Sequence, residues 1–191
     1  MTEEYQEAFL ALLEPVYPRL ARYSLAITKD RMEAEDLTSE TVLRALESYD
    51  TLNDPTKFAS FLFTIATRLN KRKRFRERMR MKYDERLAIR IADNSAGPDN
   101  AAEIRIVMDA LERLPQKVRV TVMLFEIADL SLEEIREVQS GTLSGVKSRL
   151  RRGRKLLQEM LEVGEGYEGA KGSESSFTTP MRVQMIREYV G

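Results

Sequence analysis

The sequence predicts an all-α protein of two small helical domains joined by a flexible linker, the second being a helix-turn-helix domain. Three observations support this prediction. Apolar residues recur at spacings of three and four along most of the 191 residues, and no segment alternates like a half-buried strand. Residues 93–100, which are rich in Asn, Asp, Gly and Pro, interrupt the pattern near the middle. A capped short helix, a tight turn and a long basic helix follow later in the chain.

The first domain is expected at residues 1–82 and consists of helical stretches separated by turns. Pro15 and Pro18 bend or divide the first stretch, because proline lacks a backbone donor and clashes with the preceding helical turn. The expected helices are residues 5–28, 31–48 and 56–80, with a turn-rich segment at 49–55. The apolar face of the second helix consists of Ala34, Leu37, Thr41 and Ala45.

The second domain is expected at residues 104–163, after a linker at 83–103. Leu114-Pro115 breaks its first helical stretch, because a helix rarely continues through the residue before proline. Residues 164–191 form a glycine-containing extension in which Thr179-Pro180 predicts the start of a short final helix. The alternative for this extension is a disordered end, and its role is not assigned.

The helix-turn-helix follows from a capping box at Ser131 and Glu134, in which the hydroxyl and the carboxylate each bond the other residue's backbone N–H. A short helix to Gln139 is expected, then a tight turn at 140–142 and a last helix at 143–163. An α-helix of this kind fits the major groove of DNA.

Composition excludes several kinds of chemistry. The 31 basic and 31 acidic residues balance, and 42% hydrophobic residues support folded cores. The chain has no Cys and no His, so thiol nucleophiles, disulfides, Cys/His zinc sites and Ser-His-Asp triads are impossible. No glycine-rich phosphate loop occurs either. We therefore expect a protein that is not an enzyme, with no catalytic residue, no metal and no cofactor.

Membrane association is also not expected. No apolar run approaches the roughly 18 residues that a membrane span needs. The acidic N-terminal residues lack the basic and apolar regions of a signal peptide. These observations predict a cytoplasmic protein.

The balanced charge hides strong segregation along the chain. Residues 30–47 carry six acidic and two basic residues, whereas residues 68–82 carry nine basic residues and one acidic residue. Residues 147–155 carry six basic residues and no acidic one. Two basic clusters and one acidic cluster indicate a polyanion partner and a separate protein partner.

The last helix is the sharpest of these signals. Val146, Leu150 and Leu157 share one face and are expected in the core. The other faces must then hold the polar residues, of which Arg and Lys recognise guanine and Ser serves bases or phosphate. These polar residues are Lys147, Ser148, Arg149, Arg151, Arg152 and Arg154. The simpler alternative is a solvated basic helix in a plain bundle.

The basic run at 68–82 includes Phe75 and follows Phe58, Phe61 and Phe63. Single-stranded nucleic acid binds where aromatic rings stack bases and cations follow phosphates. The alternative is that these rings belong to the core, which we expect for Phe61, whereas Phe58 beside the turn fits either interpretation.

The acidic segment at residues 33–40 has two ordinary interpretations. It forms either a solvated helix face or a docking face for a basic protein. Metal binding and paired-carboxylate catalysis are disfavoured, because no complementary base or phosphate loop accompanies the carboxylates.

The order of these signals resembles the extracytoplasmic-function (ECF) group of bacterial sigma-70-like factors. Residues 33–45 are similar to the group's acidic core-binding helix, and residues 58–69 are similar to the helix that supports promoter melting. Residues 110–115 and 130–135 resemble the start of the second domain, and residues 146–150 resemble its recognition helix. Phe61 stands where tryptophan is common, and Gly145 stands where threonine is common.

The resemblance implies a specificity subunit that binds RNA polymerase core and directs it to promoters. Glu35, Asp36 and Glu40 would meet the clamp of the largest subunit, and the second domain would meet the flap of the second-largest subunit. An anti-sigma factor is a further partner of this kind of protein. Residues 83–103 would lie near the RNA path.

The resemblance also implies two contacts with promoter DNA. The first domain would open the minus-ten element and hold a flipped base, and the second domain would read the minus-35 element in the major groove. The implied minus-ten residues are Asn53, Asp54, Lys57, Phe58, Arg68, Asn70, Lys71 and Arg72. The implied minus-35 residues are Lys147, Ser148, Arg149 and Arg152.

Two other functions fit parts of the pattern. A stand-alone helix-turn-helix regulator would bind duplex DNA without polymerase. An adaptor that mimics a sigma factor and sequesters an anti-sigma factor would need the acidic segment but not the basic residues at 147–155.

Overall fold

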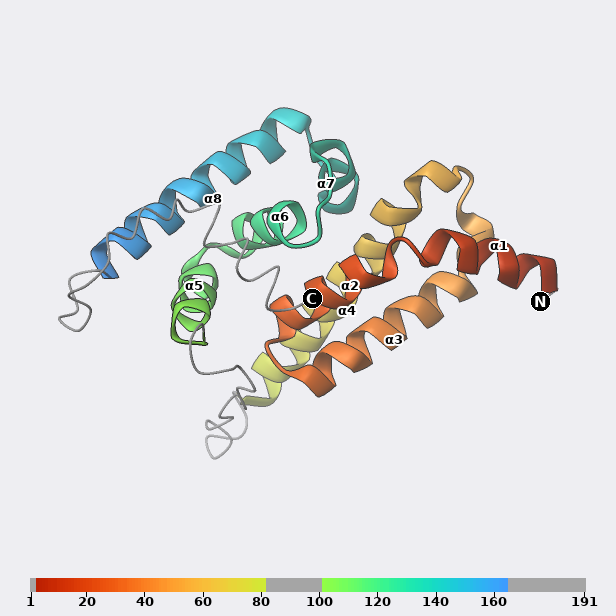
Figure 1. Ribbon diagram of the computed structural model, residues 1–191, viewed down its shortest axis with the longest axis horizontal. Coiled ribbons are helices and arrows are strands. Elements are labelled where there is room, and N and C mark those ends of the chain that lie inside the picture. Colours follow the sequence, from red (N-terminus) through yellow and green to blue (C-terminus); the bar gives the residue numbers. More distant parts are fainter. Residues whose placement is uncertain (1–2, 82–100, 165–191) are drawn as a thin grey trace. The chain divides into compact units, whose positions relative to one another are not determined.

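The computed structural model describes residues 3–81 and 101–164, and these residues form helices and turns without any strand. The first unit contains α1 (Glu3–Leu13), α2 (Tyr17–Thr28), α3 (Arg31–Glu47), the short 3-10 helices η1 (Tyr49–Thr51) and η2 (Pro55–Lys57), and α4 (Phe58–Met81). The remaining helices are α5 (Ala101–Arg113), α6 (Gln116–Glu126), α7 (Leu132–Gln139) and α8 (Leu143–Gly164) (Figure 1). The predicted all-α fold is confirmed.

The chain divides into two compact units. Helices α1 to α4 belong to the first unit, and α5, α6, α8 and the first five residues of α7 belong to the second. The expected final helix beyond residue 164 lies outside the described residues.

The helices of the first unit begin and end at residues with local causes. The interruption predicted at Pro15 and Pro18 is confirmed, because α1 ends at Leu13 and α2 begins at Tyr17. Helix α2 ends at Thr28 because the next residue, Lys29, has a left-handed φ of 63°. Asp30 then caps α3 by accepting the Glu33 N–H at 2.8 Å. This short connection lets α2 and α3 pack side by side.

The core of the first unit is rich in aromatic side chains. Tyr23 is fully buried, its ring lies 5.4 Å from that of Phe63, and its hydroxyl is 3.0 Å from the Thr67 hydroxyl. A second group joins Phe9, Tyr49 and Phe58, with ring centroids 5.4 to 6.3 Å apart. Edge-to-face contacts of this kind stabilise beyond the buried area alone. The aromatic residues therefore fix α4 against α1 and α2.

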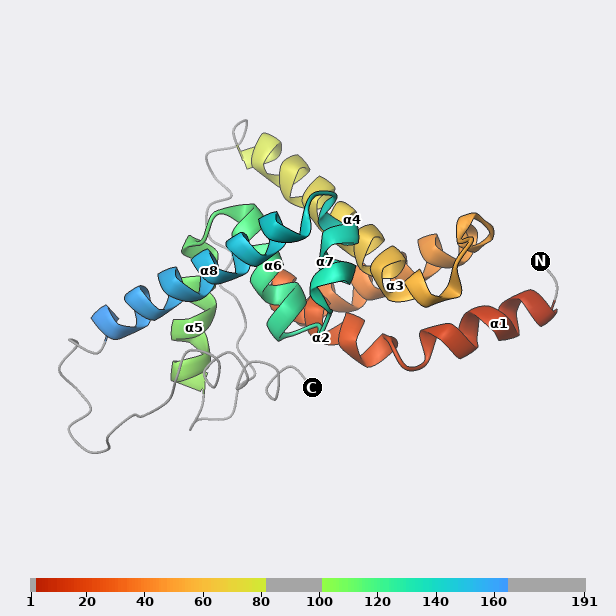
Figure 2. The same cartoon turned by 90° about the horizontal axis from the view of Figure 1, so that it is seen from above.

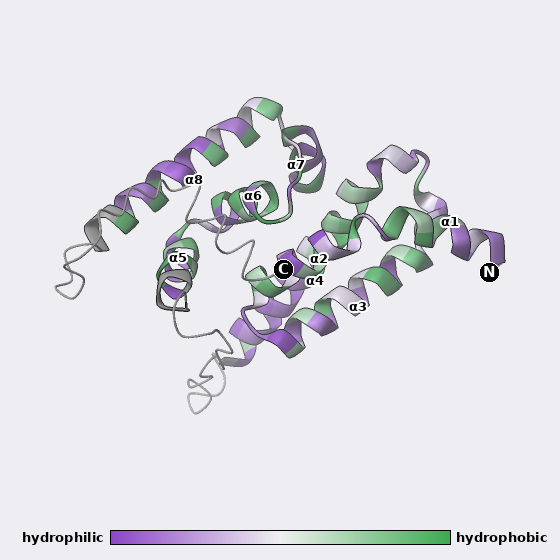
Figure 3. Cartoon of the chain, viewed as in Figure 1, coloured by the Kyte–Doolittle hydropathy of each residue, from purple (hydrophilic) through white to green (hydrophobic). Residues whose placement is uncertain are grey.

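The second unit begins with α5, which starts at Ala101, inside the expected linker at 83–103. The sequence pattern placed this start at Ile104 because Ala101-Ala102-Glu103 offers no large apolar residue. The predicted break at Leu114-Pro115 separates α5 from α6, whose residues Val118 to Leu124 are all buried. Figures 1 and 2 show α6 and α8 side by side, and the hydropathy colours of Figure 3 alternate along α8 as an amphipathic helix requires.

The capping box predicted before α7 is confirmed. The Ser131 N–H donates to the Glu134 carboxylate at 2.7 Å, and the Glu134 N–H donates to the Ser131 hydroxyl at 3.3 Å. Ser140 has a left-handed φ of 50° and forms the tight turn before α8. Within the described ranges, no helix is long and apolar enough to cross a bilayer.

Candidate nucleic-acid and protein interfaces

The N-terminus of α8 is held by Thr142. Its hydroxyl accepts the Gly145 N–H at 3.1 Å, and its carbonyl accepts the Val146 N–H at 3.1 Å. A Cβ on Gly145 would lie 3.1 Å from that hydroxyl and 3.4 Å from a guanidinium nitrogen of Arg149. A side chain at this position would therefore require the Thr142 hydroxyl, which caps the helix, to shift by a few tenths of an ångström.

The inner face of α8 packs on α6. Val146, Leu150 and Leu157 are buried, as the sequence predicted. Gly153 is buried as well, and a Cβ there would lie only 2.5 Å from Val122 Cγ2 and 3.0 Å from Val118 Cγ1. Its missing side chain is thus what allows α8 to approach α6 so closely.

Two arginines of α8 form hydrogen bonds with side chains of α6. Arg149 Nε donates to the Thr121 hydroxyl at 3.2 Å, and Arg154 donates to the Glu126 carboxylate at 2.6 and 2.8 Å. The Arg154 guanidinium also lies 5.1 Å from the Phe125 ring centroid. Arg149, predicted from the resemblance to contact DNA, is therefore half-buried and already bonded within the unit.

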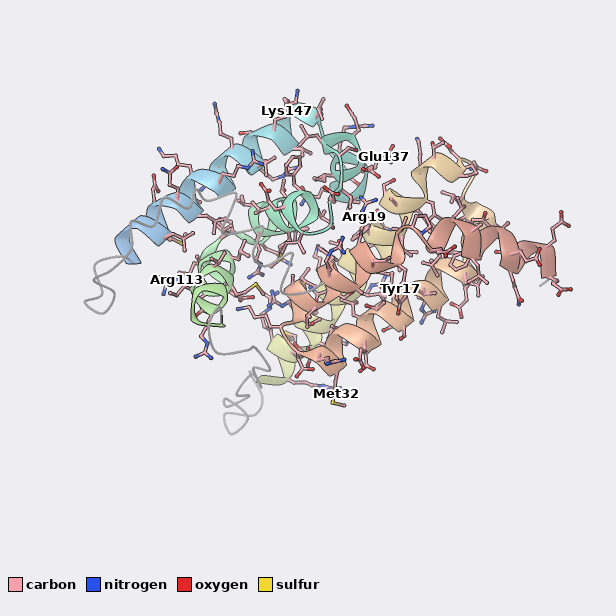
Figure 4. All side chains as sticks on the ribbon, viewed as in Figure 1. Tyr17, Arg19, Met32, Arg113, Glu137 and Lys147 are labelled. Atoms are coloured by element: carbon pink, nitrogen blue, oxygen red, sulfur yellow. The ribbon has the colours of Figure 1, made fainter. Side chains whose placement is uncertain are left out.

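The outward face of α8 is basic. Lys147, Ser148, Arg151 and Arg152 are exposed, and none has an acidic partner within the described ranges (Lys147 is labelled in Figure 4). Arg151 was not among the implied minus-35 residues. The signal that finds it is its spacing of four residues from Lys147, which places both on one face.

Helix α4 presents a second basic surface. Arg68, Lys71 and Arg72 are exposed there, whereas Asn70 is only 7% exposed. Asn70 therefore faces the core and is not available as a surface contact with a DNA strand. Lys73, on the inner side, lies 3.2 Å from the Glu33 carboxylate and ties α4 to α3.

The turn before α4 is ordered by Asp54. Its carboxylate accepts the Thr56 hydroxyl at 2.6 Å and the Thr56 N–H at 3.0 Å, which caps η2. The hydroxyl bond and the N–H bond, and to a smaller extent the Lys57 charge, lower the pKa of Asp54 from its ordinary value. Asn53 and Lys57 are exposed beside it.

Phe58 differs from these neighbours. It is 2% exposed, and its ring packs against Phe9 and Tyr49. Since the ring is enclosed, it cannot stack on a base, and the core interpretation holds for Phe58. Phe61, which was expected in the core, is half-buried at the edge of the same aromatic group.

The acidic face of α3 is exposed. Its inner residues Ala34, Leu37, Thr41 and Ala45 are buried, as predicted, so the helix points the other side outward. Glu35 pairs with Arg31 at 3.2 Å and Glu40 with Arg44 at 4.0 Å. Among the residues that the structure describes, Asp36 has neither an ion-pair nor a hydrogen-bond partner.

Two apolar side chains flank these carboxylates. Met32 is 77% exposed and Leu43 is 55% exposed, on the same side of α3 as Asp36 (Met32 is labelled in Figure 4). Met32 and Leu43 thus add exposed apolar surface beside the carboxylates of α3. In the described ranges, no three acidic side chains are placed to hold a metal ion.

Comparison with known proteins gives matches to both units. The family described as Sigma-70 region 2 matches residues 12–80, and Sigma-70, region 4 matches residues 104–157. The chain is 26% identical over 168 residues to the ECF RNA polymerase sigma factor SigW of Bacillus subtilis, covering 82% of this chain and 90% of that one. It is 27% identical over 164 residues to EcfG of Rhodopseudomonas palustris, covering 85% and 88%.

A solved structure is also similar. The sigma factor RpoE of Bartonella quintana, in complex with the anti-sigma factor NepR, aligns with a TM-score of 0.66 and 25% identity. The alignment covers 81% of this chain and 97% of RpoE.

Proposed function

The chain belongs to the ECF group of sigma-70-like factors, which direct promoter-specific transcription initiation, and we propose how its residues divide that work. The observation that supports the proposal is the separation of charge: one acidic face on α3, and two basic faces on α4 and α8. A stand-alone regulator is not favoured, because the chain matches region 2 as well as region 4. We propose domain boundaries at 1–82 and 104–163, joined by a linker at 83–103.

The face of α3 binds RNA polymerase core. Glu35, Asp36 and Glu40 contact a basic surface on the clamp of the largest subunit, and Met32 and Leu43 pack beside them. Asp36 contributes most to the binding of polymerase, because it has no ion pair in the described structure that must be broken first. Glu35 and Glu40 each form an ion pair with an arginine of α3. Exposed pairs of that kind stabilise the helix by only about 0.3–0.5 kcal/mol, so polymerase can replace them.

The turn before α4 and the first exposed basic residues of α4 bind the minus-ten element. Arg68, Lys71 and Arg72 neutralise phosphates of the unwound strand, and Asn53, Asp54 and Lys57 border the extruded base. Extrusion costs a few kcal/mol, so the turn must be ordered in advance, and the Asp54–Thr56 bonds supply that order. Phe58 and Asn70 act from the core as positioning residues.

The outward face of α8 reads the minus-35 element in the major groove. Lys147, Ser148, Arg151 and Arg152 contact bases or phosphates, because they are exposed and unpaired in the described structure. Arg149 supports them by fixing α8 to Thr121. This assignment replaces Arg149 with Arg151 in the set of minus-35 residues that the resemblance implied.

We also propose a cytoplasmic location, where polymerase is found, and the flap of the second-largest subunit as a contact of the second domain. The similar RpoE is held by an anti-sigma factor. The mixed acidic and apolar face of α3 suits such a partner as well, because a protein bound there would block polymerase.

Run-off transcription tests the proposal. Core polymerase is combined with the purified chain and a library of promoter fragments, and products are compared with those of core alone. Promoter-dependent transcripts that need the chain are the expected result. If transcription is the same with and without the chain, and the chain binds duplex DNA in a gel shift without core, the stand-alone regulator becomes the better explanation.

A further inference from the structure

We propose that Phe75 is a base-stacking residue, and that the single-strand binding surface of α4 continues past Arg72 to Met79. This inference rests on the proposed function of the first unit and extends it by about two helical turns. The ligand it requires is an unpaired nucleic-acid strand, since bases inside a duplex do not offer their faces.

The exposure of Phe75 is the first observation. Its side chain is 62% exposed and Met79, four residues later, is 45% exposed, although every other Phe in the described part of α4 is buried or half-buried. Two residues along an α-helix correspond to a rotation of about 200°, so Phe75 lies opposite Lys73, which pairs with Glu33 of α3. The ring therefore faces away from the body of the unit.

The charges around the ring are the second observation. Arg68, Lys71, Arg72, Arg78 and Met79 all lie within about 60° of Phe75 around the helix axis, because they differ from it by three, four or seven positions. The same residues are exposed. At about 1.5 Å per residue, this stripe from Arg68 to Met79 is about 16 Å long.

The cations of this stripe are available to a ligand. Among the described residues, Arg68, Lys71 and Arg72 have no acidic partner, and Arg78 bonds only the backbone carbonyl of Arg74, at 3.3 Å. On the inner side, Lys73 is paired instead. The helix thus separates cations used for folding from cations left for a polyanion.

An aromatic ring among unpaired cations is the arrangement that binds single strands. The cations follow the phosphates, while the ring stacks on a base whatever its identity. A surface made only to neutralise duplex phosphates has no use for an exposed Phe and Met. The stripe therefore fits an unpaired strand better than a duplex.

Binding of labelled single-stranded oligothymidylate to the full chain tests this inference. The Phe75→Ala variant should bind roughly tenfold more weakly, and Phe75→Trp should restore binding, because it keeps a stacking face. The same strand without bases should bind Phe75→Ala and the parent equally. Arg72→Ala should weaken binding to both strands, because phosphates are present in each.

Salt dependence gives a second readout. The slope of log K against log salt should be unchanged in Phe75→Ala and smaller by about 0.7 in Arg72→Ala, because only the second variant loses a phosphate contact. Leu10→Ala removes an apolar side chain of similar exposure, 58%, outside the basic stripe, and is the matched control. It should bind both strands like the parent.

The inference is overturned if Phe75→Ala binds oligothymidylate as tightly as the parent does. It is equally overturned if the affinity of Phe75→Ala for the base-free strand falls as much as its affinity for oligothymidylate. It is also overturned if the stripe binds anionic lipid vesicles and not the oligonucleotide. Failure of the proposed function is a separate result, namely no chain-dependent run-off transcription while the Phe75 effect on the oligonucleotide persists.

Discussion

Gly153 provides a direct test of the packing between α8 and α6. In Gly153→Ala, the new methyl would lie 2.5 Å from Val122 Cγ2 and 3.0 Å from Val118 Cγ1, closer than carbon atoms approach in folded proteins. Both neighbours are β-branched and sit in a helix, where such side chains keep one rotamer. The clash must therefore be relieved by a shift of α8, not by rotation of a valine.

The size of the effect follows from two opposing terms. Inserting a methyl into a packed core costs about 1–3 kcal/mol, whereas replacing Gly by Ala inside a helix gains about 0.8–1.0 kcal/mol. The net expectation is a loss of about 1 kcal/mol. For a unit of this size, such a loss lowers the unfolding midpoint by about 4–8 °C.

Thermal unfolding of the full chain, followed by circular dichroism, measures this loss. The double variant with Val122→Ala provides the control, because it removes the Val122 Cγ2 methyl with which the added methyl at position 153 would clash. Combining the two changes should cost less than the sum of the single changes, as expected for residues in contact. If Gly153→Ala is as stable as the parent, helix propensity dominates and the close approach of the two helices does not constrain the unit.

Other substitutions test the proposed interfaces. Asp36→Arg should lower the affinity for core polymerase in a pull-down, because it reverses the unpaired charge of α3, and unchanged capture would remove α3 from that interface. Arg152→Ala should weaken minus-35 binding by about 1–3 kcal/mol in a gel shift. Arg149→Ala should mainly lower the stability of the second unit, because it removes the bond to Thr121. A larger loss of DNA affinity in Arg149→Ala than in Arg152→Ala would refute these two roles. The folded pKa of Asp54 is depressed, so its capping contribution is present above the unfolded pKa and is lost as pH falls through the folded value. An NMR titration of the Thr56 amide should therefore show a midpoint below that of an unfolded aspartate, and a midpoint at or above the unfolded one would contradict the cap.

Local features of the fold could be predicted from the sequence because their causes are local. Helix periodicity, the interruption at Pro15 and Pro18, and the Ser131–Glu134 capping box each involve residues a few positions apart. The same is true of the buried faces of α3 and α8, which follow from apolar spacing.

Features that depend on another helix could not be predicted this way. Arg149 is a basic residue at a helix position that suits DNA contact. Only the position of Thr121, 28 residues earlier in the chain, shows that its guanidinium bonds within the unit. Phe58 stands beside a turn, and its burial depends on Phe9 and Tyr49. The need for glycine at position 153 likewise depends on two valines of α6.

The division of labour along α8 has a consequence for how promoter choice changes. The residues that anchor this helix to α6, Arg149, Gly153 and Arg154, are interleaved along it with the outward ones. Mutations at Lys147, Ser148, Arg151 and Arg152 can accordingly accumulate without eroding the scaffold. If these four residues read the minus-35 element as proposed, changes at four codons would be enough to alter promoter choice, in divergent paralogues or by design.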